Sequence, residues 1–166
     1  MIQLFRVSKD YGRFRHALIE VSCNIERGEF LFLTGPSGAG KSTFLKLLFR
    51  EESPSSGQIL VNGRNIGVLP PSQIPYFRRT VGVVFQDFKL IGRKTVFENV
   101  AYGPRIHGTR GRRQLDEIVR RHLELAGIWD EVCDRLHQPA AQLSIGQQQR
   151  RCLAMAVLSK GIRSAA

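Results

Sequence analysis

The sequence lacks any apolar run long enough to cross a membrane, and its longest apolar stretches, such as Val81–Phe85, have the length of a single strand. The N-terminus also lacks the long apolar region of a secretory signal peptide. We therefore expect a cytoplasmic protein. The length of 166 residues and the hydrophobic content of 42% suffice for one domain with its own core.

Cysteine is scarce as well, because the chain has only Cys23, Cys133 and Cys152, which are far apart and odd in number. Their spacing matches neither a disulfide framework nor a metal-ligand pattern. We expect these cysteines to pack as small buried side chains in a reducing compartment.

Acidic residues are few: the chain has 14 of them against 25 lysines and arginines, which gives a formal net charge of +11. Most of the basic residues are arginines, whose forked guanidinium suits phosphate and carboxylate partners. Nucleic acid, anionic lipid or an acidic protein would each fit this balance. In the densest cluster, however, Arg113–Glu117, Asp116–Arg120 and Glu117–Arg121 are i,i+4 pairs opposite an apolar stripe. We therefore expect the solvated face of an amphipathic helix and no specific nucleic-acid partner, since aromatic residues are not interleaved with the charges. The stripe consists of Leu115, Ile118, Val119, His122, Leu123 and Ala126.

One functional motif is complete. Residues 35–43 have the phosphate-binding form G-x-x-x-x-G-K-[ST]. Its glycines let backbone N–H groups approach phosphate oxygens, and the N-terminus of the following helix adds favourable partial charge. Lys41 would reach the β- and γ-phosphates, and the Ser42 hydroxyl would ligate Mg²⁺. The motif predicts phosphate binding by Gly35, Pro36, Ser37, Gly38, Ala39, Gly40, Lys41, Ser42 and Thr43.

The pattern of apolar residues predicts strands in the first half of the chain and helices in the second. The phosphate-binding loop is expected between a buried strand at Glu29–Thr34 and a helix at Ser42–Phe49, and Val61-Asn-Gly63 is expected to form a hairpin turn. Gly103-Pro104 should end the first helix of the second half, and Gly127 should cap the second. This order predicts an α/β core with an inserted helical subdomain. The other expected elements are strands at Ile2–Val7, Ala17–Ile25, Gln58–Val61 and Val81–Phe85, and helices at Thr95–Tyr102, Arg110–Ala126 and Ile145–Leu158.

Two shorter patterns could belong to the same site. An apolar strand ends at Gln86, which would place a neutral donor and acceptor at the sheet edge where α/β folds bind ligands. A polar residue at the end of a strand is the plainer interpretation. Leu143–Arg150 reads Leu-Ser-Ile-Gly-Gln-Gln-Gln-Arg, and its Ser144 and Gln147 have the spacing of a capping box. This segment is either a well-capped helix start or a second anion-binding helix N-terminus built from Ser144 and Gly146.

Taken in this order, the loop, Gln86 and Leu143–Gln147 resemble the Walker A, Q-loop and signature motifs of the ATP-binding cassette (ABC) ATPases, a family of P-loop NTPases. Tyr11 resembles the aromatic residue that stacks on adenine in that family. Val84–Leu90 and Thr95–Ala101 are similar to the cell-division ATPases of the FtsE type. The resemblance covers Met1–Lys160 and implies a single ABC ATPase domain. Its parts would be an α/β core at 1–94, a helical subdomain at 95–142, a signature helix at 143–160 and an atypical tail at 161–166.

This resemblance also implies ligands and partners. ATP and Mg²⁺ would be bound, with Ser42 and Gln86 holding the metal. The chain would form a homodimer in its ATP-bound state, and the ATP of one subunit would meet the signature residues of the other. An FtsX-type integral membrane permease is the implied partner, received near Phe88–Thr95 on the inner face of the bacterial cell membrane. The signature residues are Ser144, Ile145, Gly146 and Gln147.

Two departures from the family pattern change these expectations. Ile145 stands where the family has the first glycine of its signature, so we expect weaker contacts with the other subunit's nucleotide. The family continues after a position like Lys160 into a strand that ends in Asp-Glu, whereas this chain continues as Gly-Ile-Arg-Ser-Ala-Ala. The catalytic residues are therefore missing, including the switch histidine, for which His137 is no substitute. We expect a truncated core in which ATP binding is retained and hydrolysis is near background.

Two alternatives to an ABC ATPase stay open at this point. The loop is also similar to that of guanylate kinases, but 34 residues precede Gly35 here, and Leu143–Arg150 would then have no purpose. A nucleotide-monophosphate phosphorylation assay would identify such a kinase. The other alternative is an ATP-binding or partner-binding module that never hydrolyses ATP.

Overall fold

The structure is a computed structural model and describes residues 1–12, 16–85, 91–143 and 146. Its contacts divide the chain into two compact units, an N-terminal unit of residues 1–78 and a C-terminal unit of residues 79–166. Each unit is described by itself below. The finer boundaries after residues 94, 142 and 160 stay a prediction.

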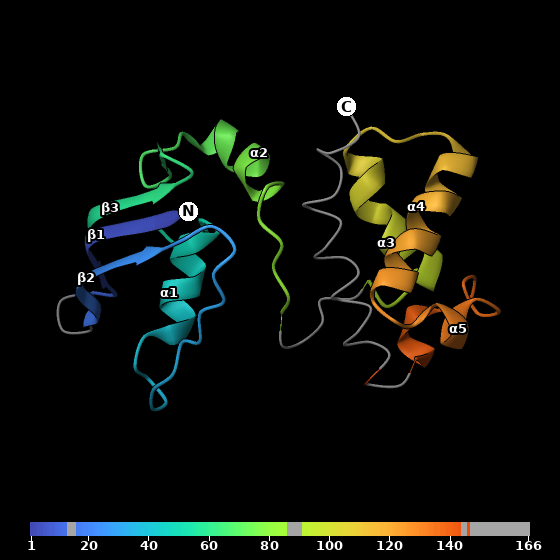
Figure 1. The fold of residues 1–166 in the computed structure, drawn as a ribbon, viewed down its shortest axis with the longest axis horizontal. Coiled ribbons are helices and arrows are strands. Elements are labelled where there is room, and N and C mark those ends of the chain that lie inside the picture. The colour runs from blue at the N-terminus through green and yellow to red at the C-terminus, as the bar shows by residue number, and fades with distance from the viewer. Residues whose placement is uncertain (13–15, 86–90, 144–145, 147–166) are drawn as a thin grey trace. The chain divides into compact units, whose positions relative to one another are not determined.

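The N-terminal unit contains a four-stranded antiparallel sheet with the strand order β2-β1-β3-β4 (Figure 1). β1 (Ile2–Asp10) is central and pairs with β2 (His16–Ile25) and β3 (Ser56–Val61), while β4 (Arg64–Asn65) lies at the edge. These strands include all three that the sequence predicts for residues 2–25 and 58–61, each with slightly wider bounds. The sheet places the end of β1 and the start of β2 next to each other, with Asp10 opposite His16.

The predicted hairpin turn between β3 and β4 is confirmed. Asn62 and Gly63 both have positive φ, 49° and 78°, as a two-residue type I′ turn requires. The flanking residues Val61 and Arg64 pair directly across the turn.

Helix α1 (Lys41–Leu48) lies against this sheet (Figure 1) and follows the phosphate-binding loop, as predicted within one residue. Phe44 and Leu47 lie three residues apart, so they share one helix face, and both are buried. The chain then forms a short 3₁₀ helix, η1 (Pro71–Gln73), and α2 (Ile74–Arg78). The core of this unit is made of Leu4, Val7, Leu18, Phe44, Leu47, Ile59, Ile66, Leu69 and Phe77.

The predicted buried strands at 29–34 and 81–85 are wrong. Neither segment is a strand, and Phe30 and Phe32 are 80% and 78% exposed. An apolar strand is stable only when neighbouring strands bond its backbone and further layers cover both of its faces. No strand among the described residues pairs with either segment. The phosphate-binding loop therefore follows an exposed, irregular segment here rather than a strand.

The C-terminal unit is helical in its described part. α3 (Val96–Ile106) and α4 (Arg112–Leu125) pack side by side (Figure 1), and α5 (Trp129–Val132) and a 3₁₀ helix, η2 (Ala140–Gln142), follow. The predicted apolar stripe of α4 is confirmed as buried or packed against the core. The core residues are Val96, Phe97, Val100, Ala101, Leu115, Val119, Leu123, Ile128, Val132 and Leu143.

The two predicted ends of these helices have different outcomes. Gly127 caps α4 as expected, with a φ of 65° and an amide that donates to the Glu124 carbonyl at 2.9 Å. Gly103-Pro104 does not end α3, so that prediction is wrong. Pro104 removes only one backbone donor from the helix and is itself buried, and the His107 amide beyond it still donates to the Gly103 carbonyl.

Candidate nucleotide-binding site

The phosphate-binding loop leads into α1 through Gly40, which caps the helix with a φ of 85° and makes no side-chain hydrogen bond. The Phe44 amide is the one that closes the first turn, by donating to the Gly40 carbonyl at 2.8 Å. The first amides of a helix have no partner inside it, and the first turn of α1 holds no acidic side chain. This end of α1 therefore offers N–H groups and favourable partial charge to an anion.

Gly40 is required here by the sheet as well as by its backbone angle. A Cβ atom at this position would lie 2.3 Å from the carbonyl oxygen of Ala17 and 2.9 Å from a methyl carbon of Leu18. The helix start can therefore approach β2 this closely only without a side chain at residue 40.

Lys41 is folded back over the loop. Its Nζ donates to the carbonyl oxygens of Gly35 and Pro36, at 2.7 Å each. These two contacts hold the ammonium group at the loop itself, so its positive charge is directed at any phosphate that the loop receives.

A cavity of about 380 Å³ joins the loop to the start of the sheet. Tyr11, His16 and Ala17 line it from the chain around the β1–β2 connection, and Lys41, Ser42 and Thr43 line it from α1. The structure thus brings Tyr11 and the phosphate-binding loop to one cavity, although about thirty residues separate them in sequence. Its size lies within the usual range of small-molecule sites.

Sequence reasoning missed the charged residues around Tyr11. The Lys9 ammonium lies 4.9 Å from the centre of the Tyr11 ring and forms an ion pair of 2.9 Å with Glu52. A hydrogen bond from Lys9 is the largest cause that lowers the pKa of Glu52. At the start of β2, His16 Nδ1 lies 2.6 Å from Asp10 Oδ1. No signal in the sequence indicates the Lys9–Glu52 pair, whose members lie 43 residues apart.

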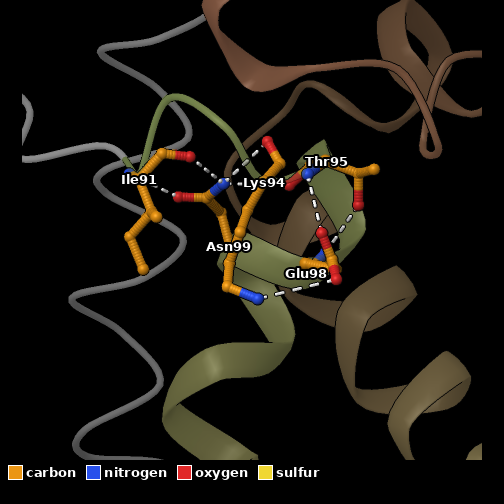
Figure 2. Close-up of polar contacts among 5 residues, drawn as sticks. All are labelled: Ile91, Lys94, Thr95, Glu98 and Asn99. Carbon is orange, nitrogen blue, oxygen red and sulfur yellow. Dashed lines mark hydrogen bonds and ion pairs between the residues drawn. The ribbon is translucent and has the colours of Figure 1, made fainter.

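The N-terminus of α3 is different, because its first amides are bonded within the chain. Val96 and Phe97 donate to the carbonyls of Gln138 and Leu136, at 3.1 and 2.8 Å. Thr95 and Glu98 form a capping box in which each side chain accepts from the other's backbone amide (Figure 2). The hydrogen bond from the Thr95 amide is the largest cause that lowers the pKa of Glu98. This helix end is therefore structural, whereas that of α1 remains able to bind an anion.

Asn99 fixes the segment that precedes α3. Its side chain is fully buried, accepts a hydrogen bond from the Ile91 amide at 3.0 Å, and donates to the carbonyls of Ile91, Lys94 and Thr95 at 2.9 to 3.2 Å (Figure 2). One amide group thus holds the turn of residues 91–95 against the helix. The part of the predicted partner-binding segment that is described, residues 91–95, has a defined shape for this reason.

A larger cavity, of about 820 Å³, lies within the C-terminal unit. Arg105, Arg110 and Arg112 line it, together with Glu98 and Asp116. Its mixed charges and the absence of a phosphate-binding loop from its lining argue against a nucleotide there. We therefore assign the candidate site to the smaller cavity.

Several predicted site residues lie outside the described residues: Gln86, Ser144, Ile145 and Gln147. Gly146 is described and exposed, and a Cβ atom there would meet no described heavy atom within 4 Å.

In the described ranges, no group of three or more His, Cys, Asp or Glu could hold a metal ion. The same ranges contain no helix with the length and apolar character of a membrane span.

The free thiols only partly meet expectation. Cys23 is half-buried, and burial is the main cause that raises its pKa, with Glu29 second. Cys133, the residue after α5, is exposed, so the prediction that it is buried is wrong. Cys152 lies outside the described residues.

With this geometry established, comparisons with known proteins identify the family. Residues 18–161 match the family model described as ABC transporter. The chain belongs to the ABC transporter family. Curated relatives include the cell division ATP-binding proteins FtsE of Bacillus subtilis (strain 168), 42% identical over 159 residues, and of Mycobacterium tuberculosis (strain ATCC 25618 / H37Rv), 39% identical over 161 residues. Each alignment covers 96% of this chain and 68% of the relative.

Solved ABC structures have the same fold. The ATP-binding cassette MJ0796, solved as a dimer in a post-hydrolysis state bound to ADP and Pi, superposes with a TM-score of 0.85 at 31% identity and covers 96% of this chain and 70% of its own. The ABC protein cbiO1 from Clostridium perfringens gives 0.82 at 27% identity, over 96% of this chain and 61% of its own. The predicted α/β fold of an ABC-type P-loop NTPase is therefore confirmed. The family match leaves the guanylate-kinase alternative without support.

Proposed function

We propose that this chain is the ATP-binding subunit of an ABC-type complex that acts in bacterial cell division. The observation that carries the proposal is the cavity shared by Tyr11, Lys41 and the start of α1, which has no side-chain cap. The ABC family match supports ATP as the ligand, and the FtsE relatives support the cellular process.

In this proposal each part of the cavity binds one part of ATP. The first amides of α1 and the Lys41 ammonium bind the β- and γ-phosphates, and Tyr11 stacks on adenine. The Ser42 side chain is exposed and lines the cavity, so its hydroxyl is suited to hold Mg²⁺ together with Gln86. The metal would neutralise phosphate charge when it is bound.

The proposal is confined to ATP binding. No acidic residue follows Asp134 among these 166 residues, so the acidic pair that ends the family's next core strand has no counterpart among them.

We further propose that ATP binding pairs two copies of the chain and that an FtsX-type permease is the membrane partner. The dimeric MJ0796 structures support the pairing. The fixed shape of residues 91–95 supports a docking role for this segment. The protein would then lie at the inner face of the membrane through its partner.

Lys41→Ala tests the nucleotide site. We expect the affinity for Mg·ATP to fall at least about tenfold, because a charge-assisted phosphate contact is lost. Equilibrium titration with a fluorescent ATP analogue measures it. Lys46→Ala is the matched control, since it removes the same charge from the same helix outside the cavity lining. Equal affinities for wild type and Lys41→Ala would contradict the proposed function.

A further inference from the structure

The end of β1 is tied to the segment that follows α1. Lys9 Nζ contacts Glu52 Oε2 and the Ser53 carbonyl oxygen, at 2.9 Å each, and the Asp10 amide donates to Ser55 Oγ at 3.0 Å. β1 leads directly to Tyr11, and α1 begins at the phosphate-binding loop. These contacts therefore link the Tyr11 side of the cavity to the helix that follows the phosphate-binding loop, in addition to the chain that connects them.

Lys9 and Glu52 also contact Tyr11 itself. The Lys9 ammonium lies over the ring, 4.9 Å from its centre, within the range of an attractive cation–π contact. Glu52, which pairs with Lys9, is also close enough to Tyr11 for the Tyr11 side chain to help lower the pKa of its carboxyl, after the larger effect of Lys9. Lys9 thus holds the ring at one face, and the other face is the one on which a second planar group would stack.

The pair is partly desolvated, which makes it more effective than an exposed ion pair. The Lys9 side chain is 12% exposed and that of Glu52 is 29% exposed. Solvent-exposed ion pairs contribute little, because water screens them and both side chains stay mobile. Here the backbone carbonyl of Ser53 fixes the ammonium as well, so the position of Lys9 over the ring is well determined.

We propose that Lys9 and Glu52 are positioning residues that hold Tyr11 against the cavity as the platform for the nucleotide base. This inference rests on the proposed ATP site and adds which residues make that site prefer a nucleoside triphosphate to a bare triphosphate. The Lys9–Glu52 contact sets the ring angle and also the distance between the platform and α1. A nucleoside triphosphate benefits from this arrangement, whereas a bare triphosphate does not.

Titration of the purified full chain with Mg·ATP and, separately, with Mg·tripolyphosphate tests the inference. The variants are Lys9→Met, Glu52→Gln and Tyr11→Ala, with Lys9→Arg as the conservative variant. Arg120→Met is the matched control, because it breaks a similar ion pair, with Glu124, and a similar cation–π contact, with Trp129, in the C-terminal unit. We expect Lys9→Met and Glu52→Gln to weaken ATP binding about two- to fivefold and to leave tripolyphosphate binding unchanged. Lys9→Arg and Arg120→Met should keep wild-type ATP affinity, and Lys9→Met should have no further effect when Tyr11 is already alanine.

Each other outcome overturns the inference in a distinguishable way. Equal weakening of both ligands would place the effect on the phosphate loop and not on the base. Wild-type ATP affinity in Lys9→Met and Glu52→Gln would show that Tyr11 needs no positioning, while the proposed function would stand. Failure of the wild type to bind ATP would overturn the proposed function and this inference together.

Discussion

Single residues decide whether the phosphate-binding loop can form, and Gly40 is the clearest case. It has a positive φ, and its Cα lies so close to β2 that a side chain would collide with the Ala17 carbonyl oxygen. Gly38 has nearly the same φ, 83° against 85°, but a Cβ atom there would meet no described heavy atom within 4 Å. Comparing substitutions at Gly38 and Gly40 therefore separates the cost of a positive φ from the cost of a collision with β2.

Gly38→Ala and Gly40→Ala should therefore differ in stability. A left-handed alanine costs about 1–2 kcal/mol, which applies to both variants. Gly40→Ala should lose a further ~1–3 kcal/mol of unfolding free energy, because the backbone of β2 or α1 must shift to make room for the methyl group. Urea denaturation of the two variants measures the difference. Equal losses would mean that the approach of α1 to β2 is looser than described.

At this scale the sequence was informative about the loop and less so about its surroundings. The residue types in 35–43 predict a phosphate site because each has a fixed mechanical role there. The contact of Lys9 with Glu52 could not be predicted, because it joins residues 43 apart whose proximity depends on how α1 packs on the sheet.

Among the elements, α3 gives the sharpest test, since its capping box contains a titrating group. The pKa of Glu98 is lowered from 4.5, first by the Thr95 amide and then by Lys94, with burial opposing. The unfolded chain therefore takes up this proton at a higher pH than the folded one. The stabilisation from Glu98 is fully present above pH 4.5 and is lost as pH falls through its lower folded value.

Glu98→Gln should reveal this loss directly, because glutamine keeps the capping geometry and cannot titrate. We expect wild type to be the more stable at about pH 7 and this advantage to shrink below pH 4.5. Thermal unfolding of both proteins across this range measures the difference. A difference that does not change with pH would show that the box carries no charge-dependent stability.

Asn99 provides a second test at this scale. Asn99→Ala leaves the half-buried amide of Ile91 and several carbonyls without their partner, which should cost about 1–3 kcal/mol. Asn99→Asp should cost more at neutral pH, because a carboxylate would face those carbonyls. Chemical denaturation gives the stabilities, and faster hydrogen exchange at the Ile91 amide would locate the change. If Asn99→Asp is as stable as wild type, Asn99 does not hold this segment.

Elements that carry their own signals were predicted well. The Asn-Gly turn, the cap at Gly127 and the apolar stripe of α4 all act within a few residues of themselves. The strands expected at 29–34 and 81–85 failed because a buried strand depends on neighbours elsewhere in a sheet, and the described residues supply none. The helix end predicted at Gly103-Pro104 was wrong for a related reason, because packing in the core keeps α3 helical beyond Pro104.

For the whole molecule, the two units carry different parts of the proposed function. The N-terminal unit holds the cavity with Tyr11 and Lys41, and the C-terminal unit holds the fixed segment at 91–95. The family assignment was available from the sequence because three motifs occur in order, each with a chemical purpose.

The central claim is that this chain binds ATP in the cavity lined by Tyr11 and Lys41. The most direct measurement is to incubate the purified chain with radiolabelled Mg·ATP, separate bound from free nucleotide, and quantify the bound fraction for wild type, Lys41→Ala and Lys46→Ala. The account predicts saturable binding that Lys41→Ala weakens at least about tenfold and that Lys46→Ala leaves unchanged. Absence of saturable binding in wild type, or equal binding by wild type and Lys41→Ala, would contradict it.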